Sequence, residues 1–567
     1  MKVWRRVAAG LEAAAAVLTG AGLVALHSGP LRFSVFGAII SVRNVSRPLM
    51  AAAILIAVRL WMLRQRQRRI ASINSIARIV SGSLIVAGVV GWLAHLSPTC
   101  GGADSYGYVS AAERLLDGDV VHPEPLAAAL PFPNPITAAC PLGYVPSGRT
   151  PNASVPAYPL GLPALMAISI AAFGREAPFF VAPILGIVLL VAAYKVGRTW
   201  YDDVHAALLG CALLALHPLV FTYSLQPMSD VPAAAALMIT VYALSRTPPR
   251  PAMAGLAAAA ALIIRPALAP AALALIVIPI SRLRQRGIAP ALWYSAVVAA
   301  GAIFQAWTQW YLYGNMFSSG YGAVAGLFSV ETSLINLRSY AYWGFRTFGP
   351  VWLASLAIGA IASTHTPRLT VLALAVGVGA PYLFYRPYDH WETLRFLLPA
   401  IAVATIVSAW GLLTVARRLA GGAGGALIAA LVAVAVAGTW TSWLSSNQVF
   451  TLPEHEARHR VVGEIVGRTT PADAVILALQ HSGSVRYYAG RETLNWDQIP
   501  SGAFQPTVES LRSRGHAVYV LIDSREEQAM FRARHGDALT SGGWLPAGQW
   551  RNVQMFEAPQ GSSQIRP

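Results

Sequence analysis

Apolar runs of about 20 residues recur along this chain until about residue 443 and then stop. A helix of about 20 residues crosses the roughly 30 Å of hydrocarbon in a lipid bilayer. The bilayer core offers no water to backbone N–H and C=O groups, so each crossing segment must satisfy its hydrogen bonds internally, as a helix does. The pattern therefore predicts an α-helical polytopic membrane protein.

The composition excludes an ordinary soluble protein. Hydrophobic residues make up 55% of the 567 residues and charged residues only 12%, whereas soluble proteins carry about 25% charged residues. The formal net charge of +17 does not indicate nucleic-acid binding, because the basic residues gather in short connections between apolar runs. We therefore expect membrane lipids, and no nucleic acid, among the partners.

The apolar runs predict about 13 membrane spans. The pair 251–264 and 267–281 is broken by Arg265 and Pro266, which indicates either a tight turn or one kinked helix. The first run is long for a signal peptide and has no clear cleavage site, so we take it as a span. In chain order the expected spans are 7–27, 45–63, 78–97, 177–194, 204–221, 230–246, 251–264, 267–281, 289–313, 348–363, 368–386, 394–414 and 423–443.

The basic residues predict the orientation. Every connection on one side of the spans is basic, including Arg5 and Arg6, the segment RQRQRR (64–69), and Arg417 with Arg418. The positive-inside rule makes that side cytoplasmic. We therefore expect a multi-pass protein of the cell (inner) membrane with a cytoplasmic N-terminus, whose longer segments and C-terminal tail lie outside.

Four regions follow from this topology. The tail segments EHEARHRVVGEIVGRT, AVILALQ, VRYYAG, TVESLRSRG, AVYVLID and SREEQAMFRARHG predict helix, strand, strand, helix, strand and helix, which is a small α/β domain. The regions are N-terminal spans in 1–97, a first extracytoplasmic loop with amphipathic helices in 98–176, a transmembrane core in 177–443, and a soluble extracytoplasmic α/β domain in 444–567.

Two aspartates lie at the expected starts of helices. Asp104 begins an amphipathic helix that ends at Gly118, and Asp230 begins the span 230–246. Each is interpreted either as a helix N-cap or as a functional carboxylate. Because most acidic residues fall in the outer segments, we expect any acid–base chemistry on the outer side.

A second group of ionisable residues lies at outer helix ends. Arg265 and Arg395 interrupt apolar stretches, where an ionised side chain costs about 2.5–3.5 kcal/mol, so they either extend to the interface or pair with a carboxylate. The segment RPYDHWETLRF also holds Asp389, His390 and Glu392. Further along, HSGSVRYYAGR (481–491) is interpreted as a surface turn.

Taken together, these motifs resemble the polytopic glycosyltransferases of the GT-C fold, in particular the bacterial family 39 type related to protein mannosyltransferases and aminoarabinose transferases. The similar segments occur in order between residues 100 and about 495: ADSYGYVSAAERLLDG, YPLGLPAL, QPMSDVPAAAAL, IIRPAL, YLYGN with SGYG, ETLRFLLPA and HSGSVRYYAGR. Two departures are Ser105, where many relatives have a second acidic residue, and two additional N-terminal spans.

The resemblance implies a membrane glycosyltransferase that transfers a sugar from a polyprenyl-phosphate-linked donor to an acceptor hydroxyl at the outer face, with inversion. It implies Asp104 as the general base, and Arg265 and Arg395 as the groups that stabilise the phosphate leaving group. Asp230 either orients sugar hydroxyls or, with Asp104, holds a divalent metal (Mg or Mn). The candidate substrate-binding residues are Tyr106, Tyr108, Tyr158, Asp230, Arg265, Tyr321, Asp389, His390, Glu392 and Arg395.

Three expectations remain. Cys100 and Cys140 share the first outer loop, so a disulfide between them is a candidate crosslink. Asp104, Arg265 and Arg395 are expected to gather around one pocket open to the outer leaflet. The acceptor stays open among a lipid, a glycan and a protein, and the alternative function is a transporter or flippase for a lipid-linked or small solute.

Overall fold

The computed structural model describes residues 2–35, 38–42, 44–62 and 68–559, so most of the predicted basic segment RQRQRR lies outside the described residues. The chain divides into two compact units, each described here by itself. The helical unit comprises Met1–Leu96, Phe179–Gln305 and Leu327–Leu452. The sheet unit comprises Ser97–Pro178, Ala306–Gly326 and Pro453–Pro567.

Seven helices in the described part of the chain are long and apolar enough to cross a membrane, which makes the protein a helical polytopic membrane protein. They are Arg6–Leu26, Ala71–Ala94, Pro178–Tyr201, Ala289–Tyr313, Val330–Ala362, His365–Leu383 and Trp391–Ser446. Shorter apolar helical stretches are Gly161–Phe173, Val204–Leu216, Asp230–Ser245, Pro251–Ile264 and Pro266–Ile280. The expected count of 13 spans stays a prediction.

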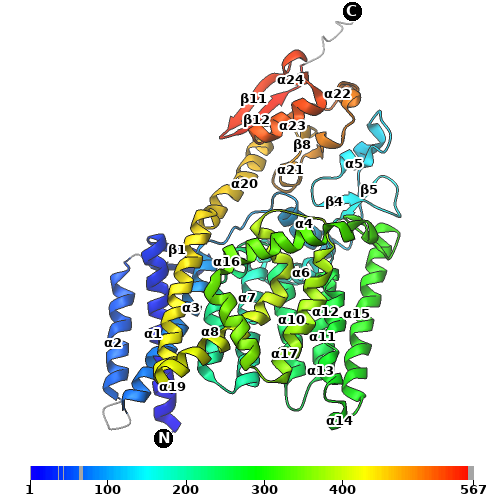
Figure 1. Ribbon diagram of the computed structural model, residues 1–567. Helices are drawn as coiled ribbons and strands as arrows, with labels where there is room; N and C mark the ends of the chain where they lie inside the picture. Colours follow the sequence, from blue (N-terminus) through cyan, green and yellow to red (C-terminus); the bar gives the residue numbers. More distant parts are fainter. Residues whose placement is uncertain (1, 36–37, 43, 63–67, 560–567) are drawn as a thin grey trace, which may run out of the picture. The chain divides into compact units, whose positions relative to one another are not determined.

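Most predicted spans of the helical unit correspond to helices (Figure 1). The agreement is closest at α11 (Pro251–Ile264) and α15 (Ala289–Tyr313). The remaining elements are α1 (Lys2–Ser28), β1 (Leu31–Val35), β2 (Ala38–Val42), α2 (Ser46–Met62), α3 (Arg68–Ala94), α7 (Pro178–Tyr201), α8 (Val204–Leu216), α9 (Pro218–Tyr223), α10 (Asp230–Ser245), α12 (Ala269–Ala274), α13 (Val277–Ile280), α14 (Leu283–Arg286), α16 (Ser333–Ala362), α17 (His365–Leu374), η5 (Ala375–Gly379), α18 (Ala380–Leu383), η6 (Trp391–Leu397) and α19 (Leu398–Ser446).

Three boundaries differ from the expected ones. Residues 333–347, expected in an outer loop, form the first half of α16, which continues across a non-helical residue at Gly349. The expected spans 394–414 and 423–443 form the single element α19, kinked at Gly421, where φ is 71°. Residues 267–281 form the short helices α12 and α13 rather than one span. Hydropathy does not register the left-handed glycines that bend a helix without ending it.

Helices α16 and α19 pack against each other through two glycines. A Cβ atom added at Gly359 would collide with the Val407 carbonyl oxygen, and one added at Gly411 would collide with the Ser355 carbonyl oxygen. Small residues that let backbones approach closely are typical of helix contacts in membranes. This crossing holds α19, which follows the Arg395 segment, against the rest of the helical unit.

The sheet unit is built around a five-stranded sheet in the order β11–β12–β10–β8–β9. Strands β8, β9 and β10 are parallel, and β12 pairs antiparallel with β10 and β11. The C-terminal elements are α20 (Leu452–Thr469), β8 (Val475–Ala478), α21 (Ser482–Ala489), β9 (Glu492–Leu494), α22 (Phe504–Ser513), β10 (Val518–Ile522), α23 (Arg525–His535), α24 (Ala538–Ser541), β11 (Leu545–Trp550) and β12 (Val553–Glu557).

The first predicted outer loop contributes to the same unit. Its elements are α4 (Asp104–Asp117), β3 (His122–Pro123), η1 (Pro125–Ala129), α5 (Ile136–Ala139), β4 (Tyr144–Pro146), β5 (Ala153–Pro156) and α6 (Gly161–Phe173). Leu126 and Ala138 lie in one buried cluster with Leu477 of β8 and Val520 of β10. Residues more than 300 positions apart in the chain therefore share one hydrophobic core.

One predicted strand of the tail is wrong. The segment VRYYAG lies in α21, a helix that ends at the left-handed Gly490, and not in a strand. The helices expected at 454–469, 507–515 and 524–536 and the strands at AVILALQ and AVYVLID are confirmed. The β-branched and aromatic residues of the wrong segment favour a strand locally, but tertiary packing overrides that preference.

Candidate functional site

The centre of the helical unit's candidate site is a buried ion pair. Asp230 lies in the first turn of α10 and is 2% exposed. The Asp230 carboxylate pairs with the guanidinium group of Arg265, whose side chain is 13% exposed. Arg265 follows the last residue of α11 in an extended conformation, with φ −140° and ψ 96°, because Pro266 cannot continue the helix. The break at IIRPAL therefore places the arginine beside Asp230.

The interpretation of Asp230 as an N-cap is wrong. Ser229 is the N-cap residue of α10, and it makes no side-chain capping hydrogen bond. Asp230 comes one position later, inside the helix, and its Oδ1 accepts a hydrogen bond from Arg265 Nη1. The alternative of pairing with a carboxylate is confirmed for Arg265. Removing both charges from water costs free energy, and a buried ion pair offsets that cost only when its two groups are in close contact.

Arg265 and Arg395 meet at one aromatic ring. The guanidinium carbon of Arg265 lies 5.9 Å from the ring centre of Phe396, and that of Arg395 lies 5.6 Å from the same centre. The Tyr382 ring stacks on Phe396 with ring centres 4.9 Å apart and planes 6° from parallel. Arg395 also lies 5.5 Å from the ring of Tyr223. Cation–π contacts hold both guanidinium groups against the Phe396 ring, and Arg265 also pairs with the Asp230 carboxylate.

Tyr223, Tyr382 and Phe396 were not among the predicted site residues. Tyr382 and Phe396 lie in YLFYRPYDHWETLRF, whose density of aromatic residues is a signal that could have pointed to them, whereas Tyr223 lies outside this segment. Tyr382 is 5% exposed, and its hydroxyl interacts with the Arg265 side chain. The aromatic residues therefore form the support on which the two arginines rest.

The other ionisable residues of this segment point elsewhere. Asp389 accepts a hydrogen bond of 2.8 Å from Trp343 Nε1, and it is exposed. His390 Nδ1 lies 3.6 Å from Glu392 Oε2, and both side chains are more than half exposed. The Glu392 backbone carbonyl, rather than its carboxylate, accepts a hydrogen bond from the Tyr223 hydroxyl. The side chain of Arg395, by contrast, lies against the rings of Tyr223 and Phe396.

In the sheet unit, Asp104 lies beside a group of tyrosines. The predicted amphipathic helix is confirmed as α4, with the left-handed Gly118 at its C-terminal end. Ala103 is the N-cap residue and Asp104 occupies the first helical turn, so the N-cap interpretation of Asp104 is also wrong. The Tyr158 hydroxyl hydrogen-bonds the Asp104 carboxylate. Burial and the Asp104 charge raise the pKa of Tyr158, so its hydroxyl stays protonated and donates this hydrogen bond.

Three predicted tyrosines are brought together here. The ring centres of Tyr108 and Tyr158 are 4.7 Å apart, and those of Tyr158 and Tyr321 are 6.3 Å apart in an edge-on arrangement. Gly107 makes room for this group, because a Cβ at that position would lie 2.6 Å from the Tyr158 ring. Asp104 is therefore bordered by an aromatic wall built from α4, the residues before α6, and the SGYG hairpin.

Tyr106 has different neighbours. It is 2% exposed and its ring centre lies 5.6 Å from that of Tyr144. Gly483 of α21 packs against the Tyr106 ring so closely that a Cβ there would collide with it. Burial raises the pKa of Tyr106. In this structure Tyr106 joins α4 to the tail, and its role in substrate binding stays a prediction.

The expected disulfide is not formed. Cys100 and Cys140 are both buried free thiols. The Cys100 backbone N–H donates to the Tyr488 hydroxyl over 2.9 Å, whereas Cys140 follows the last residue of α5. Burial raises the pKa of both thiols, that of Cys140 to about 12. Sharing one loop is a weaker requirement than the geometry of a disulfide, which needs the two Cα atoms within about 7 Å of each other.

The interpretation of HSGSVRYYAGR as a surface turn is also wrong. Arg486 of α21 is buried and forms a two-pronged ion pair with Glu124, with both N–O distances 2.9 Å. The Glu124 charge raises the pKa of Arg486 against the opposing effect of burial. This pair fastens the tail to the segment after α4, so the motif has a structural role that its local sequence does not reveal.

The divalent metal has little support from the donor set. In the part of the chain that the structure describes, no three His, Cys, Asp or Glu side chains are grouped so that they could hold a metal ion. The Asp230 carboxylate is already neutralised by Arg265. Asp104 belongs to the sheet unit and the two arginines to the helical unit. A metal held by Asp104 and Asp230, and a pocket shared by Asp104 and the arginines, stay predictions.

No protein-family model and no curated protein matches the chain. Among solved structures, it is similar to ArnT from Cupriavidus metallidurans bound to undecaprenyl phosphate, with a TM-score of 0.49 and 12% identity over 84% of this chain and 98% of that one. It is also similar to an oligosaccharyltransferase from Archaeoglobus fulgidus tethered with an acceptor peptide, with a TM-score of 0.47 and 14% identity over 85% and 74% of the two chains. These proteins are GT-C enzymes, the group that the sequence motifs resemble.

Proposed function

We propose that this protein is a membrane glycosyltransferase that transfers a sugar from a polyprenyl-phosphate-linked donor to an acceptor hydroxyl, with inversion. The observation that carries the proposal is the meeting of Arg265 and Arg395 at Phe396, beside the buried Asp230. Two guanidinium groups held at the ends of apolar helices suit a phosphate that is attached to a lipid chain. Arginine's planar fork of donors matches phosphate oxygens in geometry as well as in charge.

The reaction is a single displacement. The acceptor oxygen attacks the anomeric carbon, the bond from that carbon to the phosphate oxygen breaks, and the phosphate leaves with the bonding electrons. Arg265 and Arg395 stabilise the negative charge that develops on the leaving phosphate. Asp104 takes the proton from the acceptor hydroxyl as general base. Attack opposite to the leaving group inverts the anomeric centre.

The surroundings of Asp104 suit this role. Tyr158 is buried and donates a hydrogen bond to the carboxylate, which fixes the direction in which Asp104 can accept a proton. Tyr108 and Tyr321 extend the aromatic wall beside it. Aromatic faces and hydroxyls together suit a sugar or a lipid carrier. We assign the donor to the outer face of the inner membrane, where an activated lipid supplies sugar in the absence of cytosolic nucleotide sugars.

Comparison of Asp104→Asn with Asp117→Asn tests the proposal. Both residues lie on α4, but Asp117 is in its last turn and exposed. Purified full-length variants are incubated with a panel of radiolabelled polyprenyl-phosphate-linked hexoses and pentoses and a membrane extract as acceptor. We expect Asp104→Asn to lose at least about 100-fold in transfer rate, the lower range for a general base, while Asp117→Asn keeps wild-type activity.

Two results would contradict the proposal. Equal transfer by both variants at equal folding would end the assignment of Asp104 as the base. Accumulation of an intact lipid-linked sugar or small solute in proteoliposomes, without a covalent product, would indicate a transporter or flippase instead. The sugar itself is identified by comparing lipid-linked sugars and surface glycans before and after deletion of the gene.

A further inference from the structure

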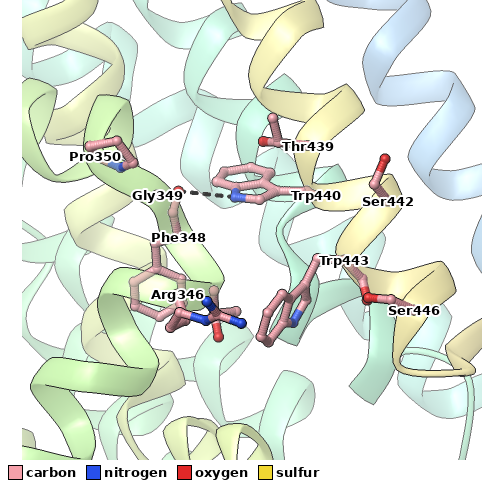
Figure 2. Close-up of a pocket in the computed structure, with 10 residues that line it drawn as sticks. Arg346, Phe348, Gly349, Pro350, Thr439, Trp440, Ser442, Trp443 and Ser446 are labelled. Carbon is pink, nitrogen blue, oxygen red and sulfur yellow. Dashed lines mark hydrogen bonds between the residues drawn. The ribbon is translucent and has the colours of Figure 1, made fainter.

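The helical unit contains a cavity of about 460 Å³ at the kink of α16. Its walls come from residues 346–350 of α16 and from the last two turns of α19, as Figure 2 shows. The lining residues that matter here are Arg346, Thr347, Phe348, Trp440 and Trp443. This volume lies in the range of about 300–1,000 Å³ that is typical of small-molecule sites.

The kink interrupts the backbone hydrogen bonding of α16 beside the cavity. Gly349 has φ 82° and ψ 162°, and the following Pro350 has no N–H to donate to the preceding turn. One of the freed carbonyls, that of Phe348, accepts a hydrogen bond of 3.1 Å from Trp440 Nε1, drawn as a dashed line in Figure 2. The aromatic residues of α19 are therefore arranged around an unwound stretch of α16.

Two buried donors in the lining have no hydrogen-bond partner among the described residues. Thr347 is 2% exposed and its Oγ1 is unpartnered, and the buried Nε1 of Trp443 is unpartnered as well. Buried donors are normally satisfied, because leaving one without a partner is costly. The Thr347 hydroxyl and the Trp443 N–H belong to residues that line one cavity, and donors without a partner there indicate a ligand with hydrogen-bond acceptors.

Arg346 adds a positive charge at the same place. The Arg346 side chain is exposed, and its guanidinium carbon lies 6.0 Å from the Trp443 ring centre. In Figure 2 it points toward Trp443. The lining includes no Asp or Glu. The polar side of the cavity therefore offers a cation and two neutral donors, which suits an anionic group with several oxygens.

The chemistry of the surroundings selects the ligand. Phe345 and Val351, on either side of the kink in sequence, are 56% and 44% exposed, and Leu431 and Val434 of α19 are 53% and 43% exposed. On helices long and apolar enough to cross a membrane, such side chains face lipid. We propose that the cavity binds an anionic glycerophospholipid, with its phosphate on Arg346, Thr347 and Trp443 and an acyl chain along Phe348 and Trp440.

This site has a structural connection to the Arg395 segment. The Trp443 and Trp391 rings meet edge to face with centres 6.2 Å apart. Trp391 is 1% exposed and is the first residue of η6, the turn that also contains Arg395. A lipid held against Trp443 therefore borders the turn that positions Arg395. Lipid binding at the cavity does not require sugar transfer, so it can be tested whether or not the enzymatic proposal holds.

Native mass spectrometry of the full-length protein in detergent tests the proposal. The protein is titrated separately with phosphatidylglycerol, phosphatidylcholine and undecaprenyl phosphate. We expect wild type to bind one phosphatidylglycerol more tightly than phosphatidylcholine, and Arg346→Gln to weaken that binding about tenfold. The matched control is Arg338→Gln, which removes the same charge from an exposed position two turns earlier on α16 and is expected to bind like wild type.

Two milder variants localise the site. Thr347→Val and Trp443→Phe each remove one donor while keeping the charge, and each is expected to weaken phosphatidylglycerol binding severalfold. Equal phosphatidylglycerol binding by Arg346→Gln and Arg338→Gln would overturn the proposal. Weaker phosphatidylglycerol binding by Arg346→Gln together with unchanged binding by the two donor variants would overturn it as well. Tighter binding of undecaprenyl phosphate than of phosphatidylglycerol, sensitive to Arg346→Gln, would overturn the choice of ligand.

Discussion

Replacement of Asp230 by asparagine removes the negative charge from a buried ion pair and leaves its partner in place. Asp230 is 2% exposed, and the Arg265 side chain is 13% exposed. The substituted amide fits the same space and can still accept a hydrogen bond, but it cannot balance the guanidinium charge. The variant therefore isolates the electrostatic part of the contact.

The expected loss of stability is large. Breaking a buried ion pair by removing one partner costs about 3–5 kcal/mol, because the remaining charge stays buried without compensation. At roughly 2 °C per kcal/mol, the lower end of the scale for folded domains, the apparent melting temperature of Asp230→Asn falls by about 6–10 °C. Cation–π contact between Arg265 and Phe396 is present in both the wild type and the variant, so it leaves this difference unchanged.

Thermal unfolding of the detergent-solubilised protein measures the effect. The control is Asp202→Asn, which breaks the pair between Arg198 and Asp202 at 3.1 Å. Those side chains are 39% and 94% exposed, and an exposed pair of this spacing is worth at most about 0.5 kcal/mol. The melting temperature of the control should therefore change by about 1 °C or less.

The double variant Asp230→Asn with Arg265→Gln decides whether the pair is the cause. Removing both charges leaves no uncompensated ion, so the double variant should be more stable than either single variant. If its loss equals the sum of the two single losses, the residues do not interact and the assignment of the ion pair is refuted. A fall for Asp230→Asn no larger than that for Asp202→Asn would refute the burial argument.

Two further predictions concern stability. Burial raises the pKa of Glu527 from 4.5 to about 7. As pH rises, the unfolded chain therefore releases this proton before the folded protein does. The free energy of unfolding then falls by up to roughly 3 kcal/mol between pH 4.5 and 7. Glu527→Gln should therefore raise the melting temperature at pH 8 and change it little at pH 5; equal shifts at both pH values would contradict this reasoning. Gly411→Ala should lower stability by about 1–3 kcal/mol, because its Cβ would collide with the Ser355 carbonyl oxygen. Gly438→Ala, with open space at the Cβ position on the same helix, should be neutral or stabilising in the same unfolding assay.

Local sequence patterns predict much of the secondary structure. The predicted runs 251–264 and 289–313 coincide with α11 and α15, and the helix beginning at Asp104 ends at Gly118 as expected. Hydropathy, helical periodicity and a left-handed glycine are properties of neighbouring residues, so they can be read without the fold. The failures at VRYYAG and at residues 333–347 occur where packing or a glycine kink overrides the local preference.

The candidate site was predicted only in part. Asp104, Asp230, Arg265 and Arg395 stand out because ionised side chains are rare beside apolar runs. Their partners do not: Phe396 and Tyr382 look like interfacial aromatics in sequence. The buried pair of Glu124 and Arg486 joins residues 362 positions apart, and no local pattern marks such a pair.

The sequence by itself determined that the chain crosses a membrane, where most helices run, and which charged residues are exceptional. Only the tertiary structure decided that neither aspartate caps its helix, that Cys100 and Cys140 stay free, and that Arg265 and Arg395 share one aromatic ring. Helix periodicity and membrane insertion depend on residues within a few turns of each other. Ion pairs, disulfides and stacked rings depend on distances between segments that are remote in the chain, and those distances are set when the segments pack.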